Sequence, residues 1–211
     1  MAKTLYIKAS IDNPCGCEAM KAFFVGLCLL PITMIVAYPA LAMNEPASQF
    51  VQDLRFHGYI DNYGNVKLRF APITALPAGF KTKGYLDIEA SDIVRLPRGL
   101  DVGGYFNAAN TAIRQLPIMK VGGYINLTNT AITRLPPNLV VRGDLSLVNT
   151  PLTQLPRRLF VEGNLYLTNS PIESIPEDIY VGGNLYIRGT KIQSVSPELR
   201  IEGQVLPSVN Q

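Results

Sequence analysis

The stretch VEGNLYLTNSPIESIP, residues 161–176, decides the fold, because altered copies of it recur along the chain. The next copy begins at Val181 (VGGNLYIRGTKIQSVS) and the preceding one at Val141 (VRGDLSLVNTPLTQLP). The copies follow each other at 20 residues, with one 19-residue step between Val102 and Val121. Such a period is typical of a solenoid, in which each unit buries its apolar side against its neighbours.

The repeats cover residues 62–211, about seven copies and a partial C-terminal one. In each copy aliphatic residues stand two and four places after the second glycine, as Leu165 and Leu167 do, which indicates a strand with one buried face. A Leu-Pro pair such as 155–156 follows, and proline disfavours a helix there. We therefore predict a β solenoid with one parallel sheet and an extended return limb. Apart from the three copies quoted, copies begin at Asn62, Thr82, Val102, Val121 and, in part, Ile201.

Two polar columns stand between the strand and the return limb of each copy. Short polar side chains here can bond backbone groups that are left free where the strand bends. Stacked from coil to coil, they would form a ladder. The columns are Asn110, Asn129, Asn149 and Asn169, followed by Thr111, Thr130, Thr150, Ser170 and Thr190.

This pattern resembles the leucine-rich repeat in its short bacterial form, with Leu-Pro in each unit. It is most similar to the repeats of secreted enterobacterial effectors and of related phage and bacterial proteins. The resemblance implies a horseshoe with the parallel sheet on its concave face, an extended convex side and binding of a partner. The Asn-Thr pair and the Val-x-Gly before each strand depart from those effectors. These departures leave open a flatter solenoid with a second strand on the return limb, at segments such as 159–161.

The first 42 residues are expected to be a signal peptide or a membrane anchor. The run 22–42 is apolar and uncharged, follows Lys21, and ends in Ala-Leu-Ala, which is typical of a cleaved signal. Met20 and Met43 are alternative start positions. We expect a secreted or cell-envelope protein, and a cytoplasmic one if translation begins at Met43. A membrane would be involved only through this segment, if it stays uncleaved.

Residues 43–61 are predicted to form an N-terminal helical cap over the first coil. The helix is expected over 45–57, with Asn44 before it and Gly58 after it. We expect His57 to pack with this helix or to be solvated rather than to act as a ligand. The apolar face is formed by Phe50, Val51 and Leu54.

The composition argues against several functions. The net charge is +3, and the basic residues are scattered among acidic ones. We therefore expect no basic stripe of the kind that binds nucleic acid. The repeats contain no cysteine and no histidine, and their carboxylates do not recur as a pair. The related ubiquitin-ligase effectors carry a catalytic domain after the repeats, whereas this sequence ends at Gln211. We expect no catalytic residues, no metal, no cofactor and no enzymatic activity. The cysteines are Cys15, Cys17 and Cys28.

The outward face of the predicted sheet is the candidate binding surface. Tyrosine and asparagine recur there, and tyrosine is enriched at protein contacts. The expected ligand is a protein, with a glycan as the alternative. Two other functions stay open: a structural or assembly component, and an intracellular effector or phage-encoded modulator of a host protein. The candidate partner-binding residues are Tyr85, Tyr105, Tyr124, Asn107, Asn126, Tyr166, Tyr186 and Arg188.

Overall fold

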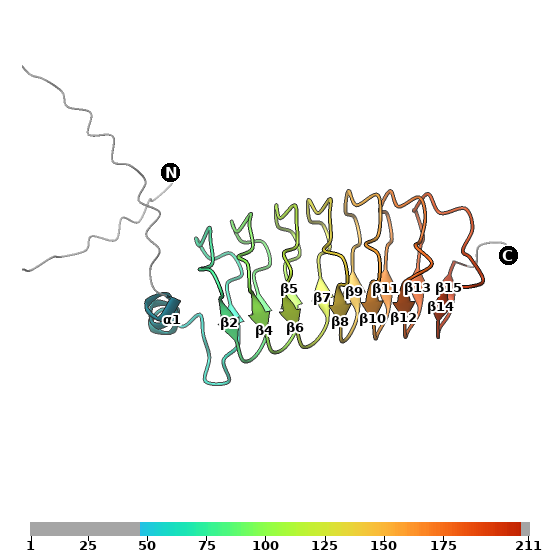
Figure 1. Ribbon diagram of the computed structural model, residues 1–211. Helices are drawn as coiled ribbons and strands as arrows, with labels where there is room; N and C mark the ends of the chain where they lie inside the picture. The colour runs from blue at the N-terminus through green and yellow to red at the C-terminus, as the bar shows by residue number, and fades with distance from the viewer. Residues whose placement is uncertain (1–46, 208–211) are drawn as a thin grey trace, which may run out of the picture. The chain divides into compact units, whose positions relative to one another are not determined.

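The computed structural model describes residues 47–207. They form one helix, α1 (Ala47–Phe56), and a parallel β-solenoid whose coils stack in chain order from β2 to β15 (Figure 1). The predicted β solenoid is therefore confirmed. The expected signal peptide or anchor in residues 1–42 lies outside the described residues.

Eight of the strands form one parallel sheet, with one short strand from each coil. Neighbouring strands pair in the repeat register, so that Leu165 lies opposite Leu145 on one side and Leu185 on the other. This is the parallel sheet that the sequence predicts. Its strands are, in order, β1 (Val66–Lys67), β3 (Leu86–Asp87), β5 (Phe106–Asn107), β7 (Ile125–Asn126), β9 (Leu145–Ser146), β11 (Leu165–Tyr166), β13 (Leu185–Tyr186) and β15 (Val205–Leu206).

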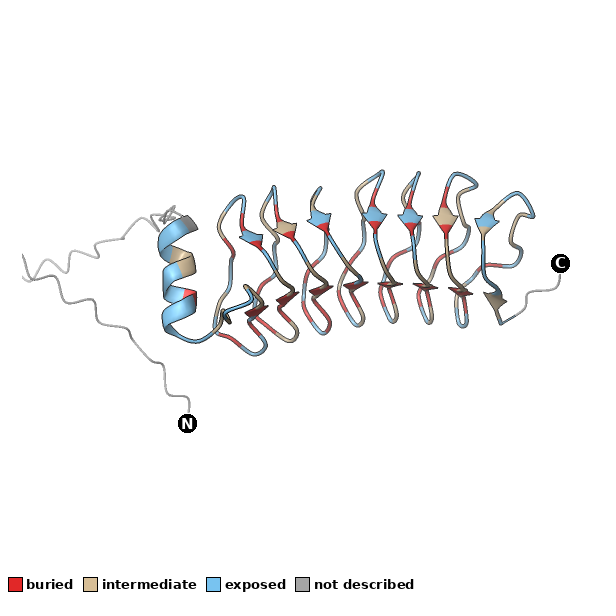
Figure 2. Cartoon of the chain, turned by 90° about the horizontal axis from the view of Figure 1, so that it is seen from below, coloured by how far each residue is buried: buried red, intermediate tan, exposed pale blue. Residues whose placement is uncertain are grey.

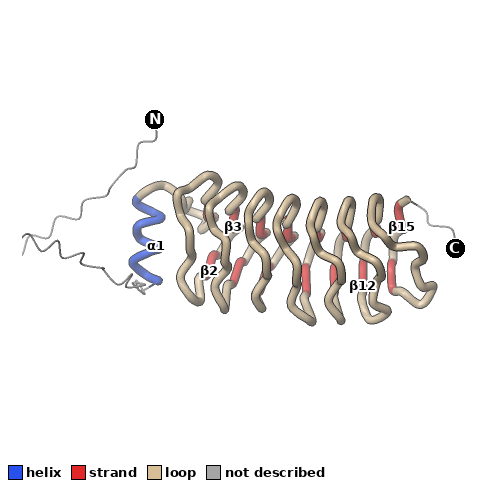
Figure 3. Tube along the Cα trace, turned by 90° about the horizontal axis from the view of Figure 1, so that it is seen from above, coloured by secondary structure: helices blue, strands red, loops and turns tan. Residues whose placement is uncertain are grey.

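The remaining strands form a second row, which lies just before the glycines of each coil. This second strand on the return limb was the alternative at residues 159–161, where the structure has β10 (Phe160–Val161). The row consists of a three-stranded and a four-stranded sheet. Strands take up little of each coil, and the rest is loop (Figure 3). The other members are β2 (Lys81–Thr82), β4 (Asp101–Val102), β6 (Lys120–Val121), β8 (Val140–Val141), β12 (Tyr180–Val181) and β14 (Arg200–Ile201).

The core lies inside the coils, between the two rows of strands. Leu145, Leu147 and Leu152 of one coil are fully buried, as the period of two and the following aliphatic position predict. In the second row β8 and β10 each pass from an exposed to a buried residue (Figure 2). Each fully buried aliphatic side chain contributes roughly 1.5–3 kcal/mol relative to an exposed one. Because every coil repeats this set, the core continues along the stack.

The two polar columns have different roles. The asparagines bond each other: the Nδ2 of Asn149 donates to the Oδ1 of Asn129 at 2.8 Å, and that of Asn169 to Asn149 at 3.0 Å. Their φ angles are positive, a conformation that asparagine tolerates better than most residues. The hydroxyl column bonds the backbone instead, as Thr150 Oγ1 does to the carbonyl of Leu147 at 2.9 Å. The predicted ladder is confirmed, and the left-handed backbone explains why its members are asparagine.

Close approach explains the conserved glycine column. A Cβ on Gly104 would stand 2.9 Å from the backbone nitrogen of Tyr85 in the preceding coil. Since real Cβ atoms do not come so near to a backbone atom, a side chain here would push the coils apart.

Helix α1 lies within the predicted limits 45–57 and contacts the first coil. Leu54 belongs to the core, and the ring of Phe50 meets that of Phe80 edge to face at 5.8 Å between centroids. His57 is exposed, and its Nδ1 lies 2.8 Å from the carbonyl of Asp53. The role of α1 as a protective cap stays a prediction.

The 19-residue step breaks the second row of strands. The turn before β4 reads LPRGLDV (96–102), whereas the one before β6 reads LPIMKV (116–121) and lacks one residue. The N–H of Phe160 donates to the carbonyl of Leu139 at 2.9 Å. In the described chain, the equivalent N–H of Val140 makes no such bond to the coil before it. The three-stranded and four-stranded sheets therefore end at β6 and β8, although these strands are neighbours.

Inserting one asparagine between Ile118 and Met119, the position that Asn138 takes in the next coil, should join the two sheets. The N–H groups of Val140 and Arg142 would then find acceptors, and two such bonds add about 1–2 kcal/mol to the free energy of unfolding. Hydrogen exchange should show both amides slowed by roughly tenfold or more. The same insertion after Arg158, in a coil that already has 20 residues, should lower stability. Unchanged exchange at Val140 would contradict this explanation of the break.

Candidate functional site

The outward face of the eight-stranded sheet carries all eight candidate residues. Three parallel columns run along it, because residues one before, one after and three after each buried strand aliphatic share this face. In the coil of β3 these positions are Tyr85, Asp87 and Glu89. The first column holds Tyr85, Tyr105 and Tyr124; the second holds Asn107, Asn126, Tyr166 and Tyr186; the third ends at Arg188.

Three of the tyrosines form a stack, which we call the tyrosine ladder: Tyr85, Tyr105 and Tyr124. The ring centroids are 4.4 Å apart between Tyr85 and Tyr105 and 4.6 Å apart between Tyr105 and Tyr124, with interplanar angles of 10° and 5°. The central ring therefore has both faces covered. What the ladder presents to solvent is a row of ring edges and hydroxyl groups, with the side chain of Tyr124 the most open at 42% exposure.

Burial raises the pKa of two tyrosines of the ladder, Tyr105 and Tyr124. Burial raises the pKa of Tyr105 to about 12, and the neighbouring Tyr124 and Tyr85 and the carboxylate of Asp87 add to the shift. Burial, followed by Asp87, also raises the pKa of Tyr124. Both hydroxyls stay protonated at neutral pH and can therefore donate hydrogen bonds.

Alkaline titration should detect this ladder. Because the pKa of Tyr105 is raised from 10.0 to about 12 in the folded state, its contribution to stability is complete below pH 10 and is lost as pH rises to 12. Absorbance at 295 nm should show late tyrosine ionisation, and Tyr105→Phe should reduce its amplitude together with part of the alkaline loss of stability. Tyr63→Phe, at an exposed site away from the ladder, is the control and should leave both unchanged. A Tyr105→Phe titration identical to that of the unchanged chain would contradict the assignment.

Tyr166 and Tyr186 form a second stack, nearer the C-terminal end of the sheet. Their centroids lie 4.6 Å apart at an interplanar angle of 11°. Burial raises the pKa of Tyr166, and the carboxylate of Asp144 adds to the effect. The two stacks lie in different columns with the coil of β9 between them, so the five tyrosines do not form one continuous patch.

The two candidate asparagines are held by bonds within the face. The Nδ2 of Asn107 donates to Asp87 Oδ1 at 3.0 Å and to Glu89 Oε2 at 3.1 Å. Asn126 Oδ1 accepts the N–H of Thr128 at 3.1 Å. These side chains are therefore oriented before any partner arrives. Arg188, which is exposed, lies just beyond β13.

Sequence reasoning missed the role of the residues that follow the conserved glycine, which we call the clamp column: Asn65, Tyr85, Tyr105, Tyr124, Asp144, Asn164 and Asn184. Asn164 Oδ1 accepts the N–H of Asn184, and Asn184 Oδ1 accepts the N–H of Gln204, both at 2.8 Å. Asn65 accepts the N–H of Tyr85 at 3.1 Å in the same way. The asparagines of the clamp column therefore bind the next coil, whereas its three tyrosines make no such bond within residues 47–207. The recurrence of Asn or Asp at this position was the only signal.

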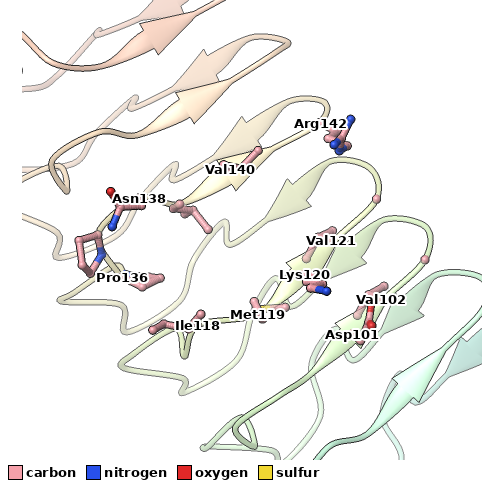
Figure 4. A pocket seen from close by; sticks show the side chains of 14 residues that line it. Asp101, Val102, Ile118, Met119, Lys120, Val121, Pro136, Asn138, Val140 and Arg142 are labelled. Carbon is pink, nitrogen blue, oxygen red and sulfur yellow. The ribbon is translucent and has the colours of Figure 1, made fainter.

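A second surface feature is a groove of about 590 Å³ at the break between β6 and β8. Figure 4 shows the side chains around it, with Ile118, Met119 and Lys120 on one coil and Pro136, Asn138 and Val140 on the next. Ile118 is 81% exposed and Val140 is 49% exposed. The groove lies beside the turn that is one residue shorter than its neighbours.

The described residues provide neither a metal-binding cluster nor a membrane-spanning helix. Among residues 47–207, no three His, Cys, Asp or Glu side chains come close enough together to hold a metal ion. Within that same stretch no helix has the length and apolar character needed to cross a membrane. Comparisons of the chain with protein-family models, curated proteins and solved structures find no match.

Proposed function

We propose that the chain is a non-enzymatic binding protein that recognises a partner protein through the outward face of its eight-stranded sheet. The likeness of its Leu-Pro repeats to those of secreted bacterial effectors supports this proposal, and the apolar run in residues 22–42 supports export. A face held by backbone bonds between coils is preorganised, so little conformational entropy is lost when a partner binds.

The replacement of the clamp by tyrosine is the observation that carries the proposal. At the position where Asn65, Asn164 and Asn184 bind the next coil, three successive coils have tyrosine instead. Coils that carry tyrosine lose this bond: among the described residues, the side-chain bonds at this position are made by Asn65, Asp144, Asn164 and Asn184, and none reaches the N–H of Tyr105. Ring stacking offsets part of the loss, by about 0.5–1.5 kcal/mol per pair. Asparagine at these positions would stabilise the stack of coils at least equally well. The presence of tyrosine therefore favours a role for its side chain in binding at the surface.

The chemistry of the ladder suits a protein partner better than a glycan. Sugar recognition by aromatic residues uses the ring faces, and in the ladder both faces of Tyr105 are covered by its neighbours. Ring edges and hydroxyl donors instead match the mixed polar and apolar surface of another protein, where tyrosine is enriched. The oriented amides of Asn107 and Asn126 adjoin the ladder in the next column.

Replacing tyrosines of the ladder by asparagine should test binding without a large loss of stability. In the double variant Tyr105→Asn and Tyr124→Asn, each new amide can accept the N–H of the next coil, so we expect the thermal midpoint to change by only a few degrees. Binding should fall, because the hydroxyl row is lost. The measurement is quantitative capture of proteins from the native host on three baits: the unchanged chain, this double variant and a control variant.

Val140→Ser with Phe160→Ser is the matched control, because these exposed side chains belong to the second row of strands. Partners should be retained by this control and lost with the ladder variant. The same partners on all three baits would refute recognition through the ladder.

A further inference from the structure

A third side of the coils carries a groove that neither row of strands explains. It lies between β3 and β4 in one coil and between β5 and β6 in the next, and its volume is about 780 Å³. We call it the arginine groove. It is lined by Val94, Arg95, Leu96, Arg98, Ala112, Arg114, Gln115, Leu116 and Pro117.

The backbones of its arginines are fixed while their side chains extend into solvent. The carbonyl of Arg98 accepts the N–H of Gly79 at 2.9 Å. The carbonyl of Arg114 accepts the N–H of Thr133 at 3.0 Å and its Oγ1 at 3.3 Å. Arg95, Arg98 and Arg114 are all exposed. The guanidinium groups are thus carried by a rigid frame.

None of these three guanidinium groups forms an ion pair within the described residues. No aspartate or glutamate lines the groove. The ion pairs among residues 47–207 are formed by other arginines and lysines, such as Arg69 with Glu89 at 3.1 Å. The closest carboxylates in the sequence are Asp92 and Asp101, each three residues from an arginine of the groove and neither among its lining residues. Arg134, paired beside Gln115, adds another positive charge on the next coil. The groove is therefore locally positive on a chain whose net charge is only +3.

We propose that the arginine groove binds an acidic segment of a partner protein, at a site separate from the eight-stranded sheet. Guanidinium groups form paired hydrogen bonds with carboxylates, so charge complementarity selects acidic side chains. Val94, which is 49% exposed, and the half-buried Leu96 offer apolar contact to the side chains that stand between the acidic ones of the partner. A bare phosphate would leave that apolar lining unused. The three arginines span two coils, which is short for a nucleic acid that needs a long basic stripe.

The probe for this site is a labelled ten-residue peptide of alternating glutamate and leucine, added to the full chain and followed by fluorescence anisotropy. We expect binding that weakens as salt is raised from 50 to 300 mM, since screening acts on exposed charges. Arg95→Gln with Arg114→Gln should weaken it by roughly tenfold, because two exposed charge contacts are lost. Arg98→Gln alone should give a smaller loss in the same direction.

Arg157→Gln with Arg158→Gln is the control that removes the same charge from another turn, and it should leave the affinity for the peptide unchanged. Equal weakening by this control would mean that only net charge matters and would overturn the proposal. So would absence of binding by the peptide, or tighter binding of phosphatidylglycerol vesicles or single-stranded oligothymidine than of the peptide. Thermal midpoints of the variants within a few degrees of the unchanged chain show that the fold is kept.

Discussion

Hydrogen bonding between successive coils is the interaction on which the rest of the structure depends. Each coil bonds its neighbours through backbone groups: in the eight-stranded sheet the N–H of Leu145 donates to the carbonyl of Asn164 in the next coil, and that of Leu165 to the carbonyl of Asn184, both at 2.9 Å. Such hydrogen bonding requires the backbone of each coil to follow the same path. The 20-residue period, the glycines at close approach and the asparagines with positive φ all follow from that requirement.

Side chains add a second level of contact to this backbone ladder. Asparagine bonds asparagine, the clamp residues bond the next coil, and the tyrosines stack at 4.4–4.6 Å. Stacking like on like is possible because the coils are in register, and it gives the outward face its order. The same register brings arginines of two adjacent coils into one groove on a different side. A solenoid thus presents a separate surface on each side of its coils.

The sequence predicted most of the fold and only part of the site. The sequence predicted the period, the buried aliphatics such as Leu165 and Leu167, and a helix over 45–57, within which α1 lies, because each repeats or has a local signal. The second row of strands stayed an alternative, since two-residue strands carry no periodicity of their own. The mutual stacking of the tyrosines and the separation of their two stacks depend on coil spacing and column position, which a list of outward residues does not convey. The break at β6 could be located from the 19-residue step, but its effect on hydrogen bonding required coordinates.

Removal of one whole coil tests the central claim most directly. Deletion of residues 141–160 joins Val140 to Val161 in the repeat register, whereas deletion of residues 151–160 joins positions half a coil apart. Denaturant unfolding followed by circular dichroism should show a cooperative transition for the 20-residue deletion, with a slope reduced in proportion to the surface lost. The ten-residue deletion should be much less stable or unfolded. Equal stability of the two deletions, or loss of folding in the whole-coil deletion, would contradict an account based on register between coils.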